Sequence, residues 1–137
     1  MEIVINRCYG GFSLSKEGTE MYLKLKGKEC YTYTNKEPYN FKSNTYVKSG
    51  KESFLSSHYI TKDLGEETDK LPNEYYFSSR DIPRDDKDLV KVVKELGNKA
   101  NGRCAELSVV EIPDNTEWTI EEYDGYEHIA EKHRTWG

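Results

Sequence analysis

A glycine turn lies between a short apolar run and a helix pattern, and it is the first segment whose residue types could do chemistry. The turn at 10–11 follows the apolar run at 3–5, and Ser13 or Ser15 can cap the helix that comes next. Free N–H groups at a helix start favour an anion, and glycines let a phosphate approach the backbone closely. Arg7 can add a charge-assisted contact. The segment predicts an anion site, although a tight turn that leads into a capped helix explains the same residues.

The C-terminal run of residues 131–136 gathers two cations, an imidazole, a hydroxyl and an indole. Arg134 and Trp136 are a combination typical of phosphate and base recognition, through a bidentate contact and ring stacking. In a strand these two side chains share one face with Lys132. The alternative interpretation is a solvated tail whose tryptophan packs on the core.

His133 is followed two residues later by Thr135, which matches one motif of the two-histidine phosphoesterases. That chemistry needs two such motifs, because one histidine acts as base and the other as acid. His58 and His128 are not followed by serine or threonine at that spacing. The sequence therefore favours a binding protein that performs no catalysis.

Metal and cofactor motifs are weak. The acidic residues at 81–88 fit helix capping better than an EF-hand loop, which requires a glycine and a terminal glutamate. Cys8, Cys30 and Cys104 are too widely spaced for a CxxC site or a disulfide framework. We expect no cofactor and no metal.

The first half of the chain reads as strand, turn and helix, followed by an irregular middle. A β-branched run predicts a strand at 2–7, and apolar spacing predicts a helix at 15–26 that ends at a glycine. The middle region, residues 28–80, is rich in Tyr, Lys and Asn. It predicts strands at 30–34, 46–47 and 74–77, with residues 62–73 as an exposed connection. This region could form a ligand lid, a subunit contact or a solvated insertion.

The second half has clearer signals. Asp85 is the expected N-cap of a helix over 87–96, which Gly97 or Gly102 would end, and residues 105–112 alternate as a strand does. An Asp-Gly pair at 124–125 indicates a hairpin, whose second arm could be a strand or a short helix at 126–133. We expect one α+β domain over 1–137. Its sheet is mixed but mainly antiparallel, with about five strands and two helices on one face.

Composition excludes several classes. The 137 residues carry a net charge of −5, which disfavours a DNA or RNA polymer as partner but allows a small anion. No apolar run is long enough to span a membrane, and the first residues lack the pattern of a secretory signal. Three wide-spaced cysteines fit a reducing cytoplasm. The chain contains 11 Tyr, 4 Phe and 2 Trp, so it has aromatic side chains that could stack on the rings of a ligand.

Two stretches resemble a known family. The opening run from Ile3 to Ser15 is one, and the second extends from Arg84 through Ile112-Pro113-Asp114 and Tyr123-Asp124-Gly125 to Trp136. Together they are similar to a widespread family of tailed-phage proteins, the anti-CBASS sponges, which capture cyclic dinucleotide signals of bacterial immunity without cleaving them. The middle region has no counterpart in this resemblance.

The resemblance implies a phage immune-evasion protein of the host cytoplasm. It would form a homo-oligomer, a tetramer, and bind 3′3′-cGAMP-like molecules. Carried onto this chain, the motif gives these candidate ligand-binding positions: Asn6, Arg7, Tyr9, Gly10, Gly11, Phe12, Ser13, Ser15, Tyr123, Lys132, His133, Arg134 and Trp136. Two alternatives stay open, a phosphodiesterase that uses His133 and a phage inhibitor that docks onto a host protein through an acidic, tyrosine-rich surface.

Overall fold

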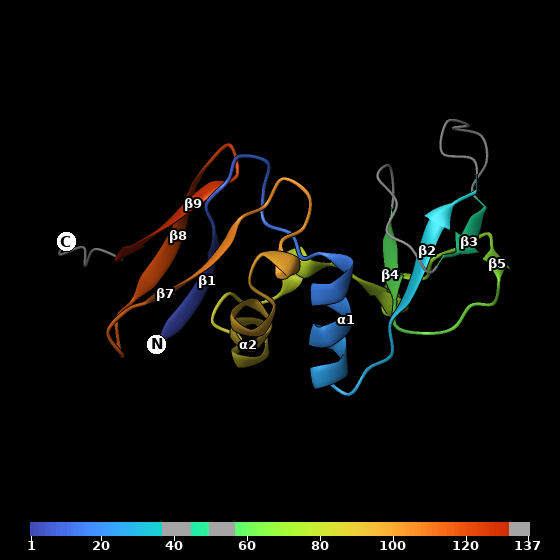
Figure 1. The fold of residues 1–137 in the computed structure, drawn as a ribbon, viewed down its shortest axis with the longest axis horizontal. Helices are drawn as coiled ribbons and strands as arrows, with labels where there is room; N and C mark the ends of the chain where they lie inside the picture. Colours follow the sequence, from blue (N-terminus) through green and yellow to red (C-terminus); the bar gives the residue numbers. More distant parts are fainter. Residues whose placement is uncertain (37–44, 50–56, 132–137) are drawn as a thin grey trace, which may run out of the picture. The chain divides into compact units, whose positions relative to one another are not determined.

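The structure is a computed structural model that describes residues 1–36, 45–49 and 57–131 (Figure 1). It divides into two compact units. Unit 1 comprises Met1–Tyr22 and Ser79–Gly137, and unit 2 comprises Leu23–Ser78. The described residues contain two α-helices, nine strands and an antiparallel five-stranded sheet, so the expected α+β class is confirmed. The strands fall into three sheets, and the irregular middle region of the sequence nearly coincides with unit 2.

Unit 1 is built on an antiparallel ribbon of β1 (Glu2–Asn6) and β7 (Leu107–Glu111). The β-branched run at 3–5 is almost completely buried, as its composition predicts. Helix α2 (Lys87–Leu96) packs against both strands (Figure 1). Its inward side chains are Leu89, Val90, Val92 and Val93. Burying each of them contributes about 1.5–3 kcal/mol, so the core of unit 1 lies at this contact.

Helix α2 begins after Asp86, so the expectation that Asp85 is its N-cap was wrong. The Asp86 carboxylate accepts hydrogen bonds from the backbone N–H groups of Asp88 at 2.8 Å and Leu89 at 3.2 Å. Its other oxygen accepts from the Tyr22 hydroxyl at 3.0 Å. Gly97 ends the helix with φ +56°, a backbone conformation that glycine adopts without steric cost.

The β8–β9 hairpin forms as the Asp-Gly pair indicates. Strand β8 (Trp118–Tyr123) pairs in antiparallel register with β9 (Tyr126–Glu131), and both turn residues, Asp124 and Gly125, have positive φ. Positive φ at both central positions is the geometry whose twist matches that of the flanking strands. The second arm of the hairpin is therefore a strand up to residue 131, and the alternative of a short helix is wrong for this segment.

Helix α1 (Lys16–Leu25) agrees with the predicted range of 15–26. Three short 3₁₀ turns complete the described elements: η1 (Asn73–Tyr75), η2 (Ser79–Asp81) and η3 (Gly97–Ala100).

Unit 2 contains the five-stranded sheet, in the order β5-β3-β2-β4-β6. Its strands are β2 (Tyr31–Asn35), β3 (Tyr46–Lys48), β4 (His58–Ile60), β5 (Glu67–Thr68) and β6 (Tyr76–Phe77). The sequence indicated β2, β3 and β6 but missed β4, and it read β5 as part of an exposed connection. Strands of two or three residues are too short to show a period.

Two side chains stabilise this sheet from one face. Tyr33 on the central strand is fully buried, and its hydroxyl donates to the Gly65 carbonyl at 2.8 Å and accepts from the Leu64 N–H at 2.9 Å. His58, opposite Tyr33 in the register, is about half-buried, and burial lowers the pKa of its imidazole below the usual 6.5. The folded state therefore favours the neutral ring.

We expect Asp86→Ala to destabilise the protein by about 1–2 kcal/mol, because the start of α2 loses its cap and Tyr22 loses its acceptor. Urea unfolding measures this difference. Asp85→Ala is the matched control, since Asp85 is exposed and should change stability by less than about 0.5 kcal/mol. Equal losses in the two variants would contradict the assignment of Asp86 as the cap.

We expect the free energy of unfolding to fall as the pH is lowered through about 6.5, because the unfolded chain then binds a proton at His58 that the folded chain resists. Urea melts between about pH 7.5 and 5.5 test this, a window above the titration of most carboxyls. His58→Gln is the control and should give a flatter dependence. A wild-type stability that rises on acidification would contradict it.

Candidate functional site

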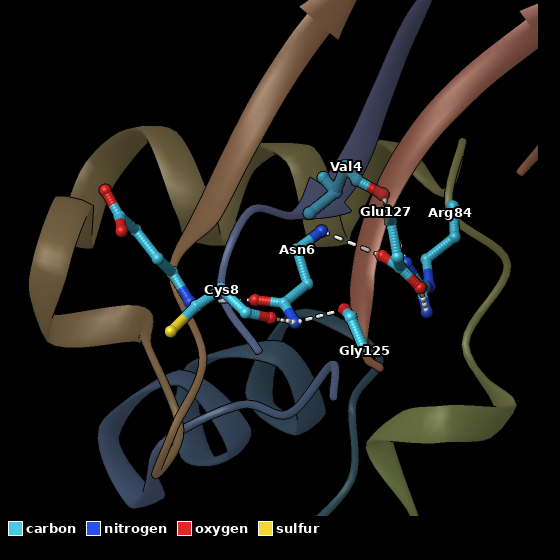
Figure 2. A network of polar contacts seen from close by, with 7 residues as sticks. Val4, Asn6, Cys8, Arg84, Gly125 and Glu127 are labelled. Atoms are coloured by element: carbon cyan, nitrogen blue, oxygen red, sulfur yellow. Dashed lines mark hydrogen bonds and ion pairs between the residues drawn. The ribbon is translucent and has the colours of Figure 1, made fainter. Parts of the chain in front are cut away.

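Asn6 links three segments of unit 1 through its side chain (Figure 2). Its amide donates to the carbonyls of Cys8 at 2.8 Å and Gly125 at 2.7 Å, and its carbonyl accepts from the backbone N–H of Glu106 at 2.9 Å. Its own backbone N–H donates to the Glu127 carboxylate at 2.8 Å. Asn6 is fully buried and both side-chain donors are used. The expected contact between Asn6 and a ligand is therefore replaced by a positioning role.

A buried ion pair lies beside this asparagine. Arg84 Nη1 and Nη2 each donate to the Glu127 carboxylate, at 2.6 and 2.9 Å (Figure 2). The Arg84 guanidinium also lies 3.7 Å from the centre of the Phe12 ring. Glu127 and Phe12 are almost completely buried. Phe12 thus packs beneath the arginine instead of offering its ring to a ligand. The sequence gave no signal for the pair, whose members are 43 residues apart.

The two serines of the expected anion site form hydrogen bonds with other parts of the chain. Ser15 caps α1 by accepting from the Gly18 N–H at 3.0 Å, while its hydroxyl donates to the carbonyl of Lys99 and its N–H to that of Ala100. Ser13 donates to the Arg103 carbonyl at 3.4 Å. Carbonyl oxygens thus lie against the first turn of the helix and would repel an anion there. These contacts give no support to a phosphate at this helix start, which stays a prediction.

The glycine turn is shaped by a close approach of another backbone. Gly10 and Gly11 have φ of +122° and +97°, and the Gly10 N–H donates to the Asp124 carbonyl at 3.0 Å. A Cβ added at Gly125 would lie 2.2 Å from the Gly11 nitrogen. The glycines therefore admit the hairpin turn at 124–125, which takes the place that the sequence assigned to a phosphate.

A hollow beside the glycine turn is unsuited to phosphate. It is lined by Arg80, Arg84 and the carboxylates of Glu122, Asp124 and Glu127. Because Glu127 already neutralises Arg84, two carboxylates remain against one arginine. The resulting charge would oppose an anion.

A second hollow, here called the Arg7 hollow, brings one predicted residue together with aromatic rings. Its volume is about 540 Å³, and residues of β1, β7, β8 and β9 line it. The polar and aromatic members of its lining are Arg7, Thr116, Trp118, Tyr126, Glu127, His128 and Glu131. Its floor includes Ile5, Val110 and Ile129. This is a mostly apolar concavity with a cation at its edge, within the usual volume range of small-molecule sites.

Tyr9 extends the aromatic surface of the Arg7 hollow. Its ring centre lies 5.5 Å from that of Tyr126, and its side chain is 62% exposed. Tyr123, the direct cross-strand partner of Tyr126, is 75% exposed. The structure thus gathers Arg7 and Tyr9 at this surface and puts Tyr123 next to it. Trp118 and Tyr126 were missed as site residues, and their place in the predicted hairpin was the available signal.

Arg7 is the main cation near the Arg7 hollow. Arg7 is exposed, and its guanidinium makes no ion pair within the described part of the chain. His128 contacts the Glu121 carboxylate at 3.0 Å, and Glu131 lies at the edge of the hollow. The predicted positions Lys132, His133, Arg134 and Trp136 lie outside the described residues.

No family model, curated protein or solved structure matches this chain. Among the residues that the structure describes, no helix is long and apolar enough to cross a membrane. The same residues contain no group of three His, Cys, Asp or Glu side chains that could hold a metal ion.

We expect Asn6→Asp to destabilise the protein by about 3 kcal/mol or more, because a carboxylate oxygen would replace a donor between two carbonyls in a fully buried place. Thermal or urea unfolding measures the loss. Asn98→Asp, at an exposed position, is the matched control and should be almost neutral. If both variants unfold at the wild-type urea concentration, the linking role of Asn6 is incorrect.

Proposed function

We propose that this chain binds a cyclic dinucleotide of the 3′3′-cGAMP type in the Arg7 hollow and sequesters it without cleaving it. The single observation that carries the proposal is that Arg7 lines the same hollow as the aromatic residues Trp118 and Tyr126, which lie on opposite faces of the β8–β9 hairpin. The resemblance of residues 3–15 and of the C-terminal stretch to phage sponges supports it. The immune-evasion role in the host cytoplasm and the homo-oligomer, a tetramer, belong to the same proposal.

The chemistry of the hollow suits such a ligand in two ways. A guanidinium can donate two parallel N–H groups to a phosphodiester, which is a stronger contact than a neutral hydrogen bond. An indole and a phenol ring offer flat faces on which a base can stack. The overall charge of −5 is no obstacle, since a small anion responds to the local cation.

Binding without cleavage fits the groups that line the hollow. Hydrolysis of a phosphodiester needs a positioned base and a positioned acid. Among the residues of the hollow, His128 faces the exposed Glu121 carboxylate at 3.0 Å, and Glu127 is held by Arg84 and the Asn6 N–H. Neither arrangement presents a free acid–base pair to a ligand. A phosphodiesterase that uses His133 is the alternative that product analysis would reveal.

The exposed tyrosines favour a second candidate, a phage inhibitor that docks onto a host protein. Tyr9 and Tyr123 are more than half exposed on one unit, and exposed aromatic residues are enriched at protein interfaces. Capture of one specific host protein, lost in a Tyr123→Ala variant, with no response to any cyclic dinucleotide, would favour this candidate over the sponge.

We expect Arg7→Ala to weaken the binding of 3′3′-cGAMP by at least about tenfold, because a charge-assisted hydrogen bond contributes about 1.5–3 kcal/mol. Isothermal calorimetry on the full chain measures the Kd. Lys91→Ala, which removes an exposed cation from α2, is the matched control and should bind as the wild type does. An unchanged Kd in Arg7→Ala would move the site away from this hollow.

Release of the ligand distinguishes sequestration from catalysis. After heating the complex, chromatography should recover the cyclic dinucleotide intact and in the amount that was bound. Linear products would contradict sequestration, and a His133→Ala variant that no longer forms them would assign the reaction to the phosphodiesterase alternative.

A further inference from the structure

One face of the sheet in unit 2 gathers three rings that the Arg7 hollow does not use. In the antiparallel register, Tyr46 lies opposite Asn35, His58 opposite Tyr33, and Tyr76 opposite Ile60. Directly opposed residues share a face, and so do residues two apart on one strand. The side chains of Tyr46, Asn35, His58 and Tyr76 therefore stand on one face, contributed by four neighbouring strands.

Hydrogen bonds fix the orientation of two of these rings. His58 Nε2 lies 3.0 Å from the Asn35 Oδ1 atom, and His58 Nδ1 lies 2.9 Å from the Tyr76 hydroxyl oxygen. Since Oδ1 only accepts, this pairing assigns the proton to Nε2, so that Nδ1 accepts from the Tyr76 hydroxyl. The chain from Tyr76 through His58 to Asn35 thus holds both rings in place without a charge.

A cleft of about 640 Å³ opens beside the rings. Tyr46, His58 and Tyr76 form one side, and the segment 69–73 forms the other. The turn that begins this segment is held by Thr68, whose hydroxyl donates to the Lys70 carbonyl at 2.9 Å and accepts from the Lys70 N–H at 3.3 Å. The second wall consists of the polar residues Asp69, Lys70 and Asn73 and the apolar residues Leu71 and Pro72.

The packing of the rings favours a flat ligand over a methylated ammonium. Tyr46 and His58 have ring centres 5.4 Å apart at 86°, and His58 and Tyr76 have centres 5.8 Å apart at 58°. Tyr46 thus meets His58 edge to face, and the ring of Tyr76 is tilted against that of His58. They leave no space among them for a methylated ammonium, which aromatic cages surround on several sides. A ligand must instead lie flat against an exposed face, and Tyr76 is 41% exposed.

The polar groups of the second wall suit a flat ring that carries nitrogen atoms. The Asp69 carboxylate can accept from a ring N–H or an amino group, and the Asn73 amide can both donate and accept. Lys70 is a cation at the edge of the same cleft, where a phosphate attached to such a ring could reach it. A nucleobase with a phosphate has this combination of features.

Catalysis by the tyrosine is disfavoured. Burial raises the pKa of the Tyr76 hydroxyl, with the neighbouring Tyr46 adding to the effect, and burial lowers the pKa of His58. Both groups stay neutral near pH 7, so the hydroxyl is a poor nucleophile and the chain of hydrogen bonds serves to position the rings.

We propose that this cleft is a nucleotide-binding site, in which a base stacks on Tyr76 against Asp69 and Asn73 while its phosphate pairs with Lys70. The site lies within unit 2 and does not rest on the function proposed for the Arg7 hollow. Its ligand class is a mononucleotide, and AMP is the probe.

Nuclear magnetic resonance on the full chain tests the proposal directly. Titration with AMP should shift the ring signals of His58 and Tyr76 in a saturable way, and adenosine should do so with a weaker affinity because it lacks the phosphate. The Arg7→Ala variant should show the same shifts, which separates this site from the Arg7 hollow. Absence of any shift at millimolar AMP, or a shift that only tetramethylammonium produces, would overturn the proposal.

Variants give the second test. Tyr76→Ala should raise the Kd for AMP at least about tenfold, because stacking of a base on an aromatic ring is the main contact. Tyr75→Ala is the matched control, since its ring lies against Lys62 and does not line the cleft. If Tyr76→Ala does not fold, Lys70→Ala replaces it, and the difference in Kd between AMP and adenosine should then disappear. Wild-type affinities in both Tyr76→Ala and Lys70→Ala would overturn the proposal.

Discussion

The hydrogen bonds of Asn6 are the constraint on which unit 1 depends. A single buried side chain at the end of β1 holds the segment at residue 106 and the turn of the β8–β9 hairpin, which lie 100 and 119 residues further along the chain. The bond to the Gly125 carbonyl is buried and satisfies an acceptor that water does not reach. The Arg84–Glu127 pair adds a second link between the same hairpin and the segment before α2.

These links show how the fold uses the residues that first suggest an anion site. Asparagine, phenylalanine, serine and glycine in one run resemble a phosphate loop, because the same small and polar groups suit both an anion and a close backbone crossing. Here the hairpin turn crosses the glycine turn and accepts a hydrogen bond from the Asn6 amide, while the serines bond to the segment at 99–103. Arg7 and Tyr9 are exposed and do not take part in this crossing. They border the hollow to which β8 and β9 contribute further aromatic residues.

Each unit presents an aromatic site of a different kind. The Arg7 hollow is lined by an exposed arginine, the aromatic residues Trp118 and Tyr126, two glutamates and several apolar residues. The cleft of unit 2 is lined by rings held in place through neutral hydrogen bonds, with one lysine and one aspartate on the other wall. Ligand binding in the Arg7 hollow depends on charge and should weaken as the salt concentration rises. Binding in the cleft of unit 2 depends mainly on ring contact.

Local patterns in the sequence determined much of the secondary structure. The β-branched run of β1, the spacing of both helices and the Asp-Gly turn each act over a few residues, and all of them formed as predicted. The choice of Asp86 over Asp85 as the cap was not predictable, since either carboxylate can cap a helix and the backbone geometry decides between them. The two- and three-residue strands β4 and β5 depend on their neighbours for pairing and left no pattern of their own.

The candidate sites were decided by tertiary structure. Composition showed that the chain has rings and a few cations to offer, but it could not show which rings would meet which cation. That choice follows from the register of β8 with β9, from the order of the strands in unit 2 and from the ion pair between Arg84 and Glu127. Such contacts join residues distant along the chain, and their free energy depends on burial that only the folded molecule provides.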